Sequence, residues 1–268
     1  MPEAGRQGRG SRGTRGTPAQ RAAGRELRFP GPGLGVATVG LAGAITAFAA
    51  TFRGSRERFW QRMTFSGLVL GSFALLASRA ARAVRVRPRD VPLGLESAGV
   101  LYLTFAAGDR FARRFIPNGD REIREIYALR RLRPRGEIAA RLALVIGPAE
   151  ELFWRGLVQE ALMRRFGRWP GAALAAGAYG GVHVVTGNFT LFGAAGVAGA
   201  HWCALYAAGA PLGALVISHV AWDIYIFLVQ PTGEVDAADA GRPRAAAVGA
   251  RRPSNPMQRN RPAAGSGW

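Results

Sequence analysis

Long apolar runs alternate with short polar connectors along the chain, and seven of these runs are long enough to cross a membrane as helices. A spanning helix needs about 17–25 mainly apolar residues. The runs lie near residues 33–52, 63–81, 91–108, 137–163, 170–187, 189–208 and 211–230. The pattern therefore predicts an all-α fold, a polytopic transmembrane helical bundle of about seven spans.

Two of the runs and one connector leave alternatives open. The run at 91–108 contains Glu96, and the run at 63–81 ends among arginines, so either helix could be tilted or lie partly in the interface. The connector 110–136 has its apolar residues at a spacing compatible with an amphipathic helix on the membrane surface. A solvated loop is the alternative for that connector.

Composition separates the two ends of the chain from its middle. Residues 1–32 and 231–268 are rich in Arg, Pro, Gly and Ala and have few large apolar side chains, so burial cannot offset their ordering entropy. We predict that both are disordered basic tails. Between them, we expect membrane helices with a basic connector at 33–136 and a second group of helices at 137–230.

The chain has a net charge of +19, and all of its 36 basic residues are arginine. These arginines lie in the tails and between apolar runs, which favours anionic lipid head groups over nucleic acid as their partner. Because nearly every connector before residue 168 contains arginine, the positive-inside rule does not decide the orientation. Arginine without lysine indicates a GC-rich genome, so we expect an integral protein of a bacterial plasma membrane.

The run at 137–163 contains charged residues that are expensive at membrane depth. An ionised side chain at a helix centre costs about 2.5–3.5 kcal/mol on insertion scales. Residues four apart share a helix face, so Glu151 can pair with Arg155, whereas Glu150 points elsewhere and is free to act on a water molecule. Pro148 favours a kink and a small wet pocket there. The alternative is a helix end with a solvated ion pair.

Two later runs contain histidines with polar or aromatic partners at the same spacing. His183 follows Tyr179 by four residues, and Asp223 follows His219 by four. Asp can orient a His tautomer and hold its charge. Each pair alone could be structural, but acid, base and orienting groups on three helices together indicate an active site. His201 has no acidic neighbour at helical spacing, and we assign it to packing.

The ordered motifs resemble a known family. Glu150-Glu151-x-x-x-Arg155, Tyr179-x-x-x-His183 and His219-x-x-x-Asp223 are similar to the motifs of the CPBP intramembrane proteases, which include the type II CAAX prenyl endopeptidases and bacterial Abi proteins. The resemblance covers about residues 137–230, which would form the catalytic core. Tyr179 stands where the family commonly has Phe, and Asp223 stands where many members have Asn.

The resemblance implies an intramembrane endopeptidase that cleaves a membrane-associated peptide or protein. Its catalytic residues would be Glu150, Glu151, Arg155, His183, His219 and Asp223. Glu150 and His183 would activate a water, and Glu151 with Arg155 would support the site. His219 and Asp223 would stabilise the oxyanion. Because an ionised Asp cannot donate a hydrogen bond, either His219 does most of this, or Asp223 is protonated or only orients His219.

Other mechanisms and functions fit the same residues. Glu150, His183 and His219 would form the zinc site of a metalloprotease, but the chain has no His-Glu-x-x-His helix. We prefer a glutamic-type hydrolase that needs no cofactor. A non-catalytic Abi-like immunity or scaffold protein, or a proton-coupled transporter using the same groups, is the alternative function. The lack of a convincing internal repeat counts against a transporter.

Overall fold

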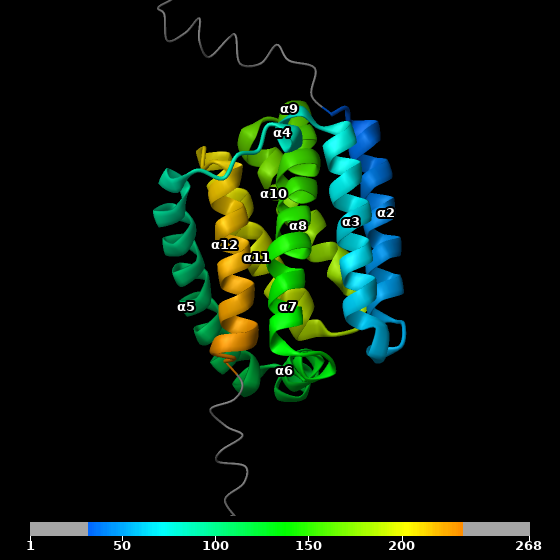
Figure 1. The fold of residues 1–268 in the computed structure, drawn as a ribbon, viewed down its shortest axis with the longest axis vertical. Helices are drawn as coiled ribbons and strands as arrows, with labels where there is room; N and C mark the ends of the chain where they lie inside the picture. Colours follow the sequence, from blue (N-terminus) through cyan, green and yellow to red (C-terminus); the bar gives the residue numbers. More distant parts are fainter. Residues whose placement is uncertain (1–31, 233–268) are drawn as a thin grey trace, which may run out of the picture. The chain divides into compact units, whose positions relative to one another are not determined.

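The computed structural model describes residues 32–232, and each predicted apolar run in this range forms a helix. Apart from residues 32, 231 and 232, the two predicted tails lie outside the described residues. Figure 1 shows the long helices side by side, with α5 along α12 and α2 beside α3. Within 32–232 there is no β-strand, as the all-α prediction requires.

The helices follow one another with short connections. Their bounds are α2 (Leu34–Phe52), α3 (Phe59–Ala77), α4 (Arg79–Arg82), α5 (Val91–Phe115), α6 (Gly119–Ala128), α7 (Arg135–Arg141), α8 (Gly147–Phe153), α9 (Glu160–Phe166), α10 (Arg168–Val182), α11 (Phe189–Ala208) and α12 (Leu212–Ile224). Short 3₁₀ segments are η1 (Arg56–Arg58), η2 (Pro88–Asp90), η3 (Leu129–Leu132) and η6 (His183–Thr186). Three π-helical segments are η4 (Leu142–Ile146), η5 (Trp154–Gln159) and η7 (Tyr225–Val229).

Four of these helical stretches are long and apolar enough to cross a membrane. They are α2, the stretch Pro88–Phe115, α11 and the stretch Leu212–Val229. The predicted number of about seven membrane spans is therefore not confirmed, although each of the seven apolar runs forms a helix. α10 has only 15 residues, and the helix through α7, α8 and α9 carries charged residues along much of its length.

The long helix from α7 to α9 contains two wide turns. The π-helical segment η4 ends just before Pro148, and the Gly147 N–H bonds the carbonyl of Leu142, five residues earlier. A proline cannot supply the N–H of a regular helical ladder, so a wide turn occurs where the sequence predicted a kink. The second π segment, η5, contains Arg155. Such segments often mark functional sites, because they change which residues face a neighbour.

The connector at 110–136 is mostly helical. α5 continues to Phe115, past its predicted end at residue 108, and an ion pair between Arg113 and Asp109 joins successive turns there. α6 follows as an amphipathic helix in which Ile123 is buried and the charged residues lie on the other face. Of the two alternatives for this connector, the amphipathic helix is therefore confirmed over α6, and its position on the membrane surface stays a prediction.

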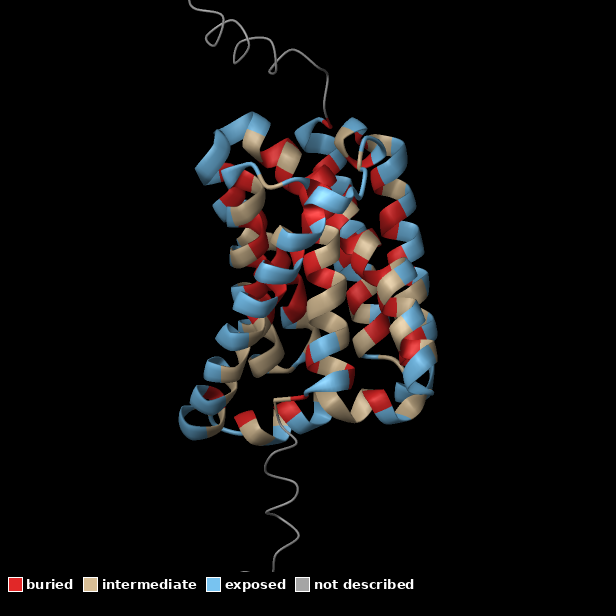
Figure 2. Ribbon diagram, turned by 60° about the vertical axis from the view of Figure 1, so that its left-hand side comes forward, coloured by how far each residue is buried: buried red, intermediate tan, exposed pale blue. Residues whose placement is uncertain are grey.

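Small residues allow α10 and α11 to approach closely. A Cβ at Gly180 would lie 3.0 Å from the Cα of Gly196, and a Cβ at Gly199 would lie 2.8 Å from the Tyr179 ring. Buried residues gather where helices face one another, and exposed residues line the outer faces (Figure 2). This close contact fixes the position of Tyr179 and of His183 one turn later.

Two adjacent glycines in α10 offer a test of this packing. We expect Gly180→Ala to destabilise the protein by about 1–3 kcal/mol, because the new methyl group meets backbone that cannot rotate away. Gly181→Ala is the control, since a Cβ there meets nothing within 4 Å. It should stabilise the helix by up to about 1 kcal/mol through helix propensity. Thermal unfolding in detergent measures both, and equal melting temperatures would contradict the packing argument.

Candidate active site

Four of the six side chains predicted for the site come together at one cavity. α8 provides Glu150, the end of α10 leads to His183, and α12 provides His219 and Asp223. All four side chains line a cavity of about 530 Å³, which also reaches Tyr179 and has a largely apolar wall. The structure thus places residues from three helices, separate in sequence, around one space.

Glu150 lies at the wall of this cavity and is only 8% exposed. The hydroxyl of Tyr179 donates to its Oε2 at 3.1 Å. The same oxygen lies 3.9 Å from Nε2 of His219. The hydroxyl that distinguishes Tyr179 from phenylalanine therefore orients the carboxylate of Glu150.

Glu151 joins Arg155 and His219 in a fully buried cluster. Arg155 donates to Glu151 Oε1 at 2.9 Å, and Nδ1 of His219 lies 2.7 Å from the same oxygen. The sequence predicted the pair with Arg155 and named Asp223 as a partner of His219. The structure places Asp223 3.6 Å from Nε2 of His219 and adds Glu151 as the partner of Nδ1. Helical spacing reveals partners on one helix only, and Glu151 reaches His219 from another.

His183 is the first residue after α10, and its ring is fixed by the helix end. Its Nδ1 lies 2.8 Å from the carbonyl oxygen of Tyr179. A carbonyl only accepts hydrogen bonds, so Nδ1 carries the proton, and Nε2 of the neutral ring is an acceptor. Phe48 contacts the imidazole edge-on, with 5.0 Å between ring centroids. His183 is thus held ready to accept a hydrogen bond.

Sequence reasoning missed the aromatic support of the site. Trp202 stacks on the imidazole of His219, with centroids 4.1 Å apart and planes at 19°. Its indole N–H donates to Ser218 at 2.9 Å, and Ser218 lies 2.8 Å from the hydroxyl of Ser97. Ser97 in turn bonds His201, which was assigned to packing. No spacing rule links these residues, because they lie on α5, α11 and α12.

Arg155 is also enclosed by rings. Its guanidinium carbon lies 4.9 Å from the ring centroid of Tyr179 and 5.1 Å from that of Trp202. Aromatic faces attract a cation, most strongly where water is excluded. The buried charge of Arg155 is therefore offset by one carboxylate and two aromatic rings.

The proposed zinc ligands do not fit a metal as they are placed. Each histidine uses Nδ1 for a hydrogen bond and keeps Nε2, an arrangement that metal-binding histidines share, so these bonds do not themselves exclude a metal. Among residues 32–232, no three His, Cys, Asp or Glu side chains are arranged to hold a metal ion. We therefore derive no step through zinc.

Comparison with known proteins gives one match. Residues 137–225 match the sequence model of a family described as Rce1-like, type II CAAX prenyl endopeptidase Rce1-like. No curated protein and no solved structure matches the chain. The apolar helices support an integral membrane protein, and the matched segment resembles the CAAX proteases. Residues 137–225 are thus similar to the Rce1-like type II CAAX endopeptidase family, which supports the resemblance drawn from the motifs.

Proposed function

We propose that this protein is an intramembrane endopeptidase that hydrolyses a peptide bond of a membrane-associated protein or peptide. One observation carries the proposal. The carboxylate of Glu150, oriented by Tyr179, shares a 530 Å³ cavity with His183, His219 and Asp223. The largely apolar wall suits a lipid-embedded segment as substrate, and the polar groups supply the chemistry of hydrolysis.

In this mechanism Glu150 is the general base. A water molecule donates one hydrogen bond to Glu150 and the other to Nε2 of His183. As the water oxygen attacks the peptide carbonyl carbon, its proton passes to Glu150. The carbon–nitrogen bond then breaks, and Glu150 returns the proton to the leaving amine nitrogen. All atoms of the substrate and of one water are accounted for in the two products, so this mechanism needs no cofactor.

The developing oxyanion needs hydrogen-bond donors. His219 can supply one from Nε2 when both ring nitrogens carry protons, and Glu151 accepts from its Nδ1. The stacked face of Trp202 favours a cationic ring through its π electrons. Asp223, 3.6 Å from Nε2, then either orients this donor or, protonated, adds a second one. In this scheme Glu151 and Arg155 hold His219 without touching the substrate.

We further propose that the site works at membrane depth in a bacterial plasma membrane. Four helices supply apolar length, and α10 together with the charged helix through α8 would cross inside the bundle, where neighbouring helices replace lipid. With α3, which has 19 residues, as a further crossing, this would restore the seven spans that hydropathy alone does not support. Prenylated tails are a eukaryotic substrate, so we expect an unmodified apolar peptide segment here.

The proposal is tested with the purified full-length chain in liposomes and a panel of membrane-embedded peptides. We expect cleavage that continues after dialysis against a chelator and incorporates one oxygen atom from the solvent water into each new carboxyl terminus. The metal content should stay far below one ion per chain. Stoichiometric zinc that is lost on His183→Ala would instead identify a metalloprotease. Absence of cleavage across the panel would favour a scaffold or a proton-coupled transporter.

A further inference from the structure

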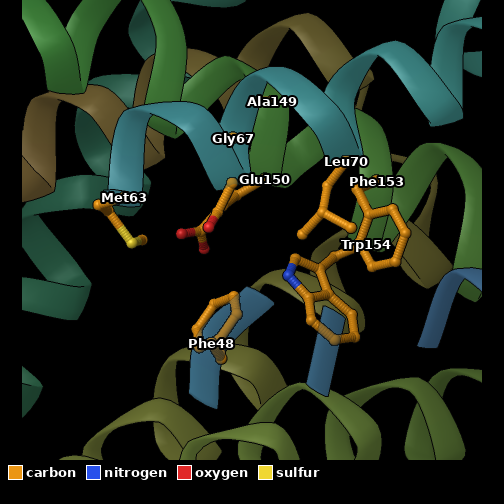
Figure 3. A pocket seen from close by; sticks show the side chains of 9 residues that line it. Phe48, Met63, Gly67, Leu70, Ala149, Glu150, Phe153 and Trp154 are labelled. Carbon is orange, nitrogen blue, oxygen red and sulfur yellow. The ribbon is translucent and has the colours of Figure 1, made fainter. Parts of the chain in front are cut away.

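A second, much smaller pocket lies against Glu150 and is separate from the large cavity. It measures about 10 Å³, and its wall is formed by α2, α3, α8 and η5. Figure 3 shows the carboxylate of Glu150 reaching into it between Met63 and Phe48. A space of roughly 10–15 Å³ on this measure holds one water molecule, provided that the water finds two to four polar partners.

The wall of this pocket is almost entirely apolar, and three polar side chains are among the residues that line it. They are Ser66 on α3, Glu150 on α8 and Trp154 on η5. The indole N–H of Trp154 is fully buried and has no hydrogen-bond partner among the described residues. The nitrogen lies on the side of the ring nearest the Glu150 carboxylate (Figure 3). A buried donor without a partner costs free energy, so this N–H needs an acceptor in the pocket.

One oxygen of Glu150 accepts no hydrogen bond from the residues that the structure describes. Tyr179 donates to Oε2, and His219 also approaches Oε2, both from the large cavity. No side chain or backbone group in residues 32–232 donates to the other oxygen, Oε1. Ser66 bonds Thr51 at 3.1 Å and keeps further hydrogen-bonding capacity. A water between these groups would satisfy Trp154 and Oε1 together.

We propose that the small pocket binds one water molecule, held by Trp154, Ser66 and Oε1 of Glu150. This water fixes the rotation of the carboxylate and keeps Oε2 turned to the substrate cavity. Trp154 is then a positioning residue that acts through the water on Glu150. The kinetic part of this inference rests on the proposed function, whereas the binding of water does not.

Water binding is measured by NMR on the full chain in nanodiscs, with ¹⁵N-labelled tryptophan indoles. The chain has six tryptophans, and Trp154→Phe assigns the signal. We expect a cross-peak between the Trp154 N–H and water. The cross-peak should persist in Ser66→Ala, because that variant has no hydroxyl proton near the indole that could cause the signal. Trp202 is the comparison, because its N–H donates to Ser218. Any cross-peak of Trp202 should vanish in Ser218→Ala, where the hydroxyl is gone.

The positioning role is measured by peptide hydrolysis. Trp154→Phe keeps an aromatic ring but removes the donor, so we expect kcat to fall about tenfold with KM unchanged, which corresponds to about 1.4 kcal/mol of transition-state stabilisation. Trp169→Phe, at an exposed tryptophan of α10, should change neither constant.

Each result decides one part of the inference. Absence of the Trp154 cross-peak from the parent would overturn the water site. An unchanged kcat in Trp154→Phe would overturn the positioning role. If the parent protein cleaves no peptide, the proposed function fails, and the NMR measurement still decides whether the pocket binds water.

Discussion

Glu150→Gln is expected to lower the rate of peptide hydrolysis by about 10²–10⁴-fold, the range that general bases contribute, while the protein stays folded. The amide keeps the shape of the side chain, and its oxygen still accepts from the Tyr179 hydroxyl. It cannot take a proton from water, so only the chemical step is lost. Steady-state cleavage of a membrane peptide measures the rate, and thermal unfolding in detergent measures the fold.

Glu160→Gln on α9 is the matched control. Glu160 also accepts from a tyrosine hydroxyl, that of Tyr206, but it does not line the large cavity. We expect this substitution to leave kcat and KM unchanged. A parental rate in Glu150→Gln, or an equal loss in both variants, would contradict the assignment of Glu150 as the base.

Arg155→Met is expected to destabilise the protein by about 3–5 kcal/mol, because it leaves the carboxylate of Glu151 buried without its cation. Both side chains of this pair are 0% exposed. The double variant Glu151→Gln, Arg155→Met should recover much of that loss, since no unpaired charge is left in the bundle. Unfolding by denaturant in mixed micelles measures the free energy of unfolding for each variant.

The ion pair of Glu160 and Arg164 is the control for this experiment. It has the same spacing and the same 2.9 Å distance, but its side chains are 21% and 30% exposed. Because water and salt screen such a pair, Arg164→Met should cost only about 0.3–0.5 kcal/mol. Equal losses at Arg155 and Arg164 would show that burial of the Glu151 pair contributes nothing to stability.

The helices were predictable from the sequence because apolar length is a local property. Each apolar run became a helix, and the amphipathic spacing around Ile123 indicated α6. The number of spans was less predictable. α10 has only 15 residues. Whether such a short helix contacts lipid or lies within the bundle depends on the helices packed around it.

Part of the candidate site could also be predicted from residues close together in the sequence. The pairing of Glu151 with Arg155 and the common face of His219 and Asp223 follow from four-residue spacing within one helix. The same reasoning gave no signal for a second partner of His219, which is Glu151 on another helix, at Nδ1. It also gave no signal for Trp202 or Trp154, whose aromatic rings fit any apolar helix.

By itself, the sequence determined that the chain forms apolar helices and that its charged residues occur in three ordered motifs, because helix periodicity and the cost of charge in lipid act over a few residues. Only the tertiary structure decided which oxygen of Glu150 faces the cavity, which acid holds His219, and which tryptophans surround them. The approach of α8, α10, α11 and α12 sets those contacts. Residues far apart in the chain acquire a shared environment only when the helices pack.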